Sequence, residues 1–162
     1  MHLIDYYENH GEGFAHYADV ISKKPYIYAD HFGPHDIESH DFSSGLSPKE
    51  LGRDMGLRFT TLPTLKVGLE NGIEALRSIF PRLWIDAVKC KQLLKCLENY
   101  RKEFDVHHNV YKLRPLHDWS SHGADSARYL AIAVKRYVDM PKEGIDDKQA
   151  NIWYEQNNPR FD

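Results

Sequence analysis

Apolar residues recur along the chain at two different intervals, and these intervals predict helices that alternate with strands. Apolar residues three or four positions apart predict the helices. The capping-box sequence Ser47-Pro-Lys-Glu50 marks the start of one helix, and Pro81 marks the end of another. Short β-branched and aromatic runs bounded by Gly, Pro or Asp predict the strands. The predicted helices cover residues 13–22, 47–56, 67–80, 86–100 and 124–138, and the predicted strands cover residues 2–7, 26–28, 57–61, 83–85 and 109–113.

This order of elements is typical of an α/β domain with a mostly parallel or mixed sheet. Residues 1–138 are long enough to form one such domain with its own core. From Asp139 the chain becomes polar, and residues 139–162 are expected to form a tail, either packed through Trp153 or disordered. No glycine-rich phosphate loop follows a predicted strand, which argues against nucleotide binding by that route.

Cysteine spacing and hydropathy indicate a cytoplasmic protein. Cys90 and Cys96 fall on roughly opposite faces of a predicted helix, so they suit neither a zinc ligand pair nor a redox motif. We expect reduced thiols in a cytosolic setting, the bacterial or host cytoplasm. No apolar run approaches the length of a membrane span, and the first residues lack the apolar core of a signal peptide, so no membrane partner is expected.

Charge is unevenly distributed along the chain. Residues 1–50 contain nine acids and three lysines, whereas residues 77–114 contain nine bases and four acids. An acidic half beside a basic half suits a metal-dependent enzyme that acts on a polyanion. The alternative is that these charges only solvate the outer faces of helices.

Two aspartates lie where α/β domains commonly bind ligands. Asp36 follows the predicted strand 26–28 and a Gly-Pro turn, and Asp125 lies at the head of the helix over 124–138. Mg²⁺ favours carboxylate and water ligands, and phosphodiester hydrolysis with two metal ions needs such hard ligands. The adjacent His35 and the nearby His122 are candidates to orient a carboxylate or contact a phosphate. Each aspartate also has an ordinary alternative role, in a helix cap or turn or beside the helix dipole.

Other chemistry has less support in the sequence. His31, His35 and His40 share one loop, but their spacing of four and five residues matches no zinc motif. No serine lies in the context of a nucleophile elbow, so acyl transfer is not indicated. The aromatic residues are expected to pack in the core more often than to stack on bases.

Two stretches, taken together, resemble a known family. Tyr-Ala-Asp-His-Phe-Gly-Pro-His-Asp-Ile-Glu at 28–38 and His-Gly-Ala-Asp-Ser-Ala-Arg-Tyr at 122–129 resemble, in this order and spacing, the C-terminal nuclease domain of terminase large subunits of tailed bacteriophages. Residues 69–77 and 97–101 are similar to the same family, so the resemblance spans residues 1–138. It implies a ribonuclease H-like fold with three layers, in which helices flank a mixed central sheet. It also implies metal-dependent cutting of concatemeric viral double-stranded DNA during genome packaging.

The resemblance further implies roles and partners. Asp36 matches the family's second metal-binding aspartate and Asp125 its third, which implies two divalent ions, Mg²⁺ or Mn²⁺. Double-stranded DNA is the implied substrate, and the terminase small subunit and the portal protein are the implied packaging partners. The family's first catalytic aspartate lies upstream of the segment that resembles residues 2–8, so the domain is expected to be N-terminally incomplete and to lack the ATPase motor. Asp5 lies on the segment that resembles the second strand, although Asp5 or Glu38 is available as a substitute for the missing acid.

Two alternatives remain open at this point. One is a catalytically inactive remnant of a prophage terminase that binds DNA or docks onto the packaging motor. The other is a different ribonuclease H-like nuclease, such as a resolvase, which would prefer branched DNA to linear duplexes.

Overall fold

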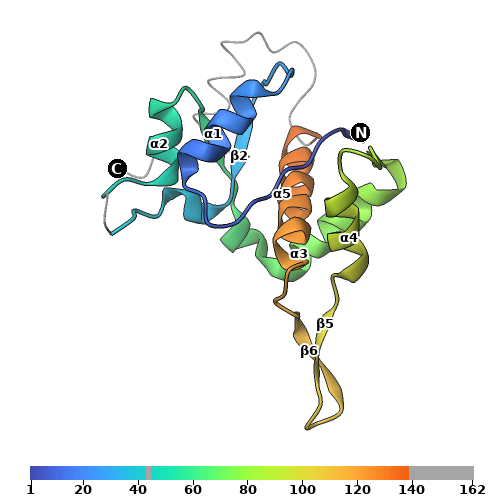
Figure 1. Cartoon of the computed structure of the whole chain (residues 1–162). Helices are drawn as coiled ribbons and strands as arrows, with labels where there is room; N and C mark the ends of the chain where they lie inside the picture. Colours follow the sequence, from blue (N-terminus) through green and yellow to red (C-terminus); the bar gives the residue numbers. More distant parts are fainter. Residues whose placement is uncertain (43–44, 139–162) are drawn as a thin grey trace.

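The structure is a computed structural model that describes residues 1–42 and 45–138, and in it helices alternate with short strands (Figure 1). The mixed α/β class predicted from the sequence is therefore confirmed. The helices are α1 (Phe14–Lys23), α2 (Pro48–Asp54), α3 (Thr64–Ile79), α4 (Lys91–Asn99) and α5 (Ser121–Val138), with 3-10 turns η1 (His35–Glu38) and η2 (Phe80–Arg82). The strands are β1 (His2–Leu3), β2 (His31–Gly33), β3 (Phe59–Thr61), β4 (Trp84–Ile85), β5 (Lys102–Asp105) and β6 (Val110–Pro115).

The strands pair in three separate two-stranded sheets. β1 runs parallel to β4, β2 runs parallel to β3, and β5 and β6 form an antiparallel hairpin. Within residues 1–42 and 45–138, no hydrogen bonds join these pairs into the single central sheet that the sequence led us to expect. The predicted tail over 139–162 lies outside the described residues.

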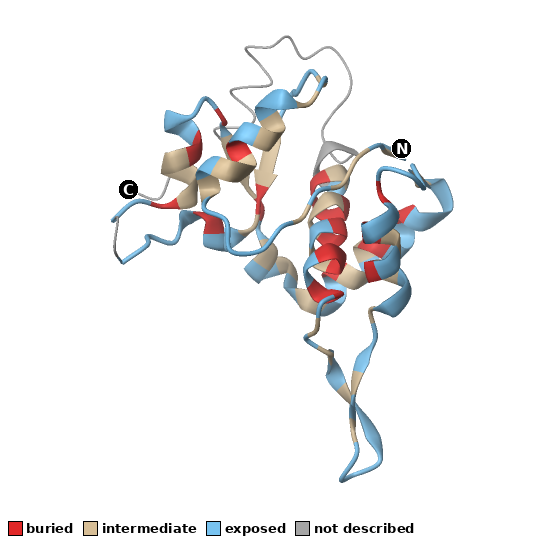
Figure 2. Cartoon of the chain, viewed as in Figure 1, coloured by how far each residue is buried: buried red, intermediate tan, exposed pale blue. Residues whose placement is uncertain are grey.

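Helix α5 runs through the middle of the molecule and takes part in both clusters of buried residues (Figure 2). Ala127 and Ala131 pack with residues of α3 and α4, including Leu76 and Leu93. Residues Ile132 and Ala133 instead pack with Leu62, which follows β3, and with partly buried residues that include Phe32 of β2. Helix α5 therefore packs against α3 and α4 on one side and against the β2–β3 pair on the other, and it joins these two parts of the molecule.

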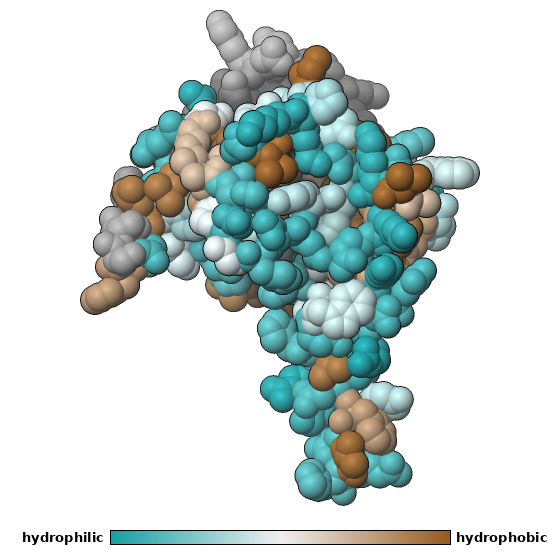
Figure 3. Space-filling model, viewed as in Figure 1, coloured by the Kyte–Doolittle hydropathy of each residue, from teal (hydrophilic) through white to brown (hydrophobic). Residues whose placement is uncertain are grey.

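The β5–β6 hairpin projects from this body (Figures 1 and 3). Its Phe104 and Tyr111 rings face each other across the strands at a centroid distance of 5.0 Å, yet both side chains are largely exposed. At the turn, Asn109 has a φ of 54°, a left-handed conformation that asparagine tolerates better than most residues. The sequence predicted β6 but missed β5.

Local signals placed the starts of α1 and α2 to within one residue, whereas α4 begins at Lys91, five residues after the predicted start, and α5 begins at Ser121, three residues before it. The capping box before α2 is confirmed, because the Ser47 hydroxyl accepts a hydrogen bond from the Glu50 N–H while the Glu50 carboxylate accepts one from the Ser47 N–H. The predicted helix over 67–80 begins earlier, at Thr64, and is broken at Gly68, where φ is 73° and ψ is 170°.

The strand predicted at 26–28 is wrong, because the strand in this region is β2, which begins at His31, five residues after the predicted start. The Tyr26 and Tyr28 side chains instead hold the segment through their hydroxyl groups, which donate to Asp5 and to the Ile21 carbonyl. Similarly, the predicted strand over 2–7 keeps its ladder only at His2 and Leu3. Among the described residues, no helix is both long and apolar enough to cross a membrane.

Candidate functional site

Asp36 and Asp125, which lie far apart in the sequence, line the same open hollow of about 620 Å³. Asp36 comes from η1, directly after β2, and Asp125 comes from the first turns of α5. His117 and His122 line the hollow as well, and Tyr129 forms part of its wall. The structure thus brings together three of the four site residues predicted from the sequence.

The end of β2 is shaped so that Asp36 faces solvent. Ile37 is buried beneath η1, and a Cβ atom at Gly33 would lie only 2.4 Å from the Ile37 Cδ1 atom. A side chain at position 33 would push on Ile37, so the close return of η1 over the strand end favours glycine there. Asp36 lies beside the buried Ile37 and is itself exposed, and its carboxylate accepts no hydrogen bond from any residue that the structure describes.

The second acid, Asp125, is partly buried and is paired with Arg128 one turn later on α5. The Arg128 Nε atom lies 3.2 Å from the Asp125 Oδ1 atom, and the Nη2 atom donates to the same oxygen. The Arg128 side chain is itself buried. Sequence reasoning did not predict this pair, although Arg128 follows Asp125 by three residues, a spacing that places two side chains beside each other on a helix.

The histidines divide into two groups. The His122 ring is exposed at the hollow and packs edge-on against the His117 ring, with centroids 5.6 Å apart. Sequence reasoning missed His117, which only its position five residues before His122 could have suggested. His35 does not line the hollow, because its Nδ1 atom lies 2.6 Å from the Thr64 hydroxyl at the start of α3, which ties its ring there.

The electrostatic effect of the two acids is visible at Tyr129. Burial raises the pKa of Tyr129, and the negative charges of Asp125 and Asp36 raise it further, against the opposing effect of Arg128. The Arg128 guanidinium also lies over the Tyr129 ring, 5.6 Å from its centroid. Tyr129 therefore remains a neutral hydroxyl beside two carboxylates at any pH near neutrality.

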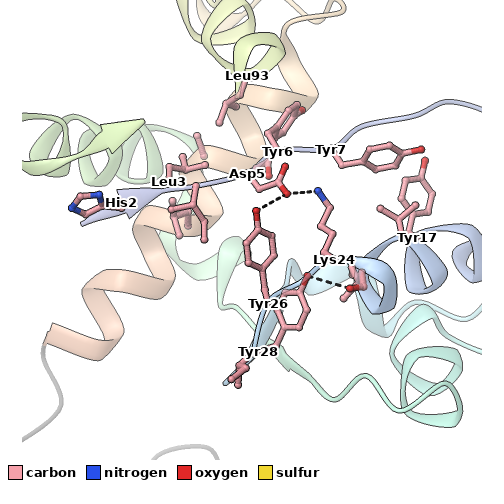
Figure 4. Close-up of a pocket in the computed structure, with 17 residues that line it drawn as sticks. His2, Leu3, Asp5, Tyr6, Tyr7, Tyr17, Lys24, Tyr26, Tyr28 and Leu93 are labelled. Carbon is pink, nitrogen blue, oxygen red and sulfur yellow. Dashed lines mark hydrogen bonds and ion pairs between the residues drawn. The ribbon is translucent and has the colours of Figure 1, made fainter. Parts of the chain in front are cut away.

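Asp5 lies in a different cavity (Figure 4). This open cavity, of about 550 Å³, is lined by the first residues of the chain, α1, the segment around Tyr26, Leu93 and one side of α5. There the Asp5 carboxylate accepts hydrogen bonds from Lys24 and Tyr26. Burial alone would raise the pKa of Asp5, but these hydrogen bonds outweigh it and hold the pKa below its usual value.

Glu38, the other available substitute for a missing acid, is also occupied. Its Oε1 atom accepts hydrogen bonds from the Lys49 ammonium and the Thr61 hydroxyl, both of which lower the Glu38 pKa. Neither Asp5 nor Glu38 lines the hollow that Asp36 and Asp125 share.

The donor set in the hollow suits one kind of ion. Two carboxylates are the protein ligands with which Mg²⁺ is commonly bound, because this ion keeps several of its waters and also binds substrate phosphates. Among the described residues, no group of three or more His, Cys, Asp or Glu side chains is arranged to hold a metal. The hollow therefore fits a hard, partly hydrated divalent cation in the type of its ligands, and the described residues that line it include two acids, Asp36 and Asp125.

Comparisons of the chain with models of protein families, with curated proteins and with solved structures found no match.

Proposed function

We propose that this chain is a metal-dependent endonuclease domain of the terminase large-subunit type, with a ribonuclease H-like fold, that cuts concatemeric viral double-stranded DNA during genome packaging. The observation that carries the proposal is the shared hollow of Asp36 and Asp125. These two acids belong to the two stretches on which the resemblance rests, and they come from different parts of the chain. If the resemblance of each stretch were due to chance, there would be no reason to expect Asp36 and Asp125 to lie in the same hollow.

In this proposal Asp36 and Asp125 hold Mg²⁺ or Mn²⁺ at the hollow. The bound cations would activate a water and stabilise the charge on the phosphodiester oxygens. Asp36 offers a carboxylate that accepts no hydrogen bond from the described residues, and Asp125 offers the oxygen to which Arg128 does not donate.

The histidines at the hollow have a separate task. His122 and His117 are exposed beside the acids, so either ring nitrogen can donate a hydrogen bond to a phosphate oxygen or transfer a proton to the leaving oxygen. Tyr129, which keeps its proton, adds a neutral hydrogen-bond donor in the wall. His35 is assigned no role in the reaction, because Thr64 holds its ring.

Basic side chains supply contacts to the DNA backbone. Part of the basic stretch over 77–114 is neutralised internally, since Glu103 pairs with both Lys112 and Arg114. Other members are exposed and form no ion pair with any described residue, namely Arg82, Lys91, Lys95 and Lys102. Such contacts do not depend on sequence, and they make binding sensitive to salt.

The test is plasmid nicking by the purified chain with Mn²⁺, Mg²⁺ or EDTA. The variants Asp36→Asn and Asp125→Asn keep the side-chain size and a carbonyl oxygen, so Arg128 retains an acceptor, and only the charge is lost. We expect each to reduce metal-dependent nicking by at least about 100-fold, beyond the loss caused by removing a hydrogen-bond partner of a ligand. Glu98→Gln, at an exposed position on α4, is the matched control and should cut like the wild type. Undiminished nicking by both asparagine variants would refute the assignment.

One observation favours a second candidate, an inactive remnant that binds DNA or docks onto another packaging component. It is the absence of a third acidic or histidine ligand arranged with the other two in the described part of the chain. This candidate predicts salt-sensitive binding of linear duplex DNA that EDTA does not change, without nicking under any metal condition.

A further inference from the structure

Arg128 is the only charged residue among the buried residues of the part of the chain that the structure describes, with 7% of its surface exposed. A buried charge is costly unless it is paired. Its sole carboxylate partner there is Asp125, on the same helix. An arginine on the exposed face of α5 would avoid the cost of burial. The burial of Arg128 next to Asp125 therefore indicates that the pair has a specific role.

The pairing uses one oxygen of Asp125 and leaves the other. Both the Nε and the Nη2 atoms of Arg128 donate to Oδ1, whereas Oδ2 accepts no hydrogen bond from residues 1–42 or 45–138. The side chains also differ in exposure, at 9% for Arg128 and 31% for Asp125. Asp125 lines two cavities, the hollow shared with Asp36 and a smaller one of about 190 Å³ lined in part by Arg128 and Tyr100.

Helix α3 leaves room for this arrangement. Gly72 is buried, and a Cβ atom there would lie 3.3 Å from the Arg128 Nη1 atom and 3.8 Å from its Cδ atom. A glycine inside a helix costs about 1 kcal/mol relative to alanine. Gly72 leaves space in which the Arg128 guanidinium packs closely against α3, and this packing offsets the cost of the glycine.

We infer that Arg128 is a positioning residue for cation binding: it holds Oδ1 of Asp125 so that Oδ2 alone is presented to a divalent cation shared with Asp36. This inference rests on the proposed function and goes beyond it, because it assigns a role to a residue that acts through Asp125 and not as a ligand of the metal. A planar guanidinium that makes two hydrogen bonds to one oxygen fixes the carboxylate more firmly than an ammonium can.

Charge and positioning predict changes of opposite sign when Arg128 is replaced. The guanidinium repels a nearby cation, so if charge alone mattered, removing it would tighten Mn²⁺ binding. If positioning matters, its removal frees the carboxylate to rotate and weakens Mn²⁺ binding, by about 10–100-fold for the loss of a partner that orients a ligand. The sign of the change therefore separates the two roles.

The experiment measures Mn²⁺ affinity by electron paramagnetic resonance on the full 162-residue chain. We expect both Arg128→Lys, which keeps the charge, and Arg128→Met, which removes it, to weaken Mn²⁺ binding by about 10–100-fold. Lys135→Met removes an exposed charge from the same helix and should leave the affinity unchanged. Nicking by both Arg128 variants should then need more Mn²⁺ for half-maximal rate and recover at saturating Mn²⁺.

A second variant tests the same point without changing the arginine. Gly72→Ala favours the helix but pushes on Nη1, so it should also weaken Mn²⁺ binding while circular dichroism shows an intact fold. It keeps the inference open to refutation even if Arg128→Met fails to fold. Tighter or unchanged Mn²⁺ binding in a folded Arg128→Met variant, or in Gly72→Ala if Arg128→Met does not fold, would overturn the positioning role alone. A wild-type chain that binds no Mn²⁺ would overturn the proposed function, and the positioning role with it.

Discussion

Two buried leucines of similar exposure allow the packing that shapes the site to be separated from packing that only stabilises the fold. Leu62 is 0% exposed and lies in the cluster that joins the β2–β3 half to α5, with Ile132 and Ala133. Leu93 is 1% exposed and lies on α4, in the cluster formed with α3 and the other side of α5. Replacing either with alanine should therefore cost a similar free energy of unfolding.

The magnitude follows from burial. Leu→Ala at a fully buried position costs about 2–5 kcal/mol, from lost transfer free energy and from the cavity that remains. For a chain of this size each kcal/mol lowers the melting temperature by about 2–4 °C, so each variant should melt about 4–20 °C below the wild type. Thermal unfolding followed by circular dichroism measures this change.

The effects on the site should differ. The Leu62 N–H donates to the Gly33 carbonyl, 2.8 Å away, at the strand end that carries η1 and Asp36. Truncating Leu62 lets this strand end shift relative to α5, and so changes the separation between Asp36 and Asp125. Leu93 lines the cavity that contains Asp5 and is not among the residues that line the hollow of Asp36 and Asp125. At a temperature where both variants are folded, Leu62→Ala should weaken Mn²⁺ binding and Leu93→Ala should not. Equal weakening in both would refute the reasoning that β2–α5 packing sets the site.

Two further predictions concern stability alone. Asp5→Asn should destabilise the chain near neutral pH, because the pKa of Asp5 is lower in the folded state than in the unfolded state. The stability that this carboxylate contributes is present above its unfolded pKa of about 3.9 and is lost as the pH falls through its folded pKa. The difference in melting temperature between Asp5→Asn and the wild type should therefore shrink in acid. Ser47→Ala removes the hydroxyl of the α2 capping box and should cost about 0.5–2 kcal/mol in urea unfolding, whereas the exposed Ser22→Ala should cost less.

Elements defined by local chemistry were predictable from the sequence. The Ser47-Pro-Lys-Glu50 start specifies its own hydrogen bonds, so α2 was predicted with its cap. Helix α5 was predicted from its apolar spacing, with an error of three residues at its start. Such signals act within one turn of the chain and need no partner elsewhere.

Strands depend on partners that the sequence does not specify. Tyr26 to Tyr28 have high strand propensity, yet the ladder with β3 forms at His31 to Gly33, where the backbone of residues 59–61 is available. Strand β5 was missed for the same reason, since Lys102 to Asp105 contains one apolar residue and is recognised as a strand only through its pairing with β6. The division of the strands into three pairs likewise follows from tertiary packing and not from local pattern.

The candidate site shows where sequence reasoning gains from geometry. Residue types and order were enough to select Asp36, Asp125 and His122, which share the hollow, but they also selected His35, which Thr64 holds elsewhere. A histidine adjacent in sequence to an acid need not lie beside it, because consecutive side chains on a turn point in different directions. A residue one helical turn away does lie beside it, and this is the relation of Arg128 to Asp125. The helical spacing within His-Gly-Ala-Asp-Ser-Ala-Arg-Tyr therefore places a buried arginine next to one acid of the site that we propose binds cations.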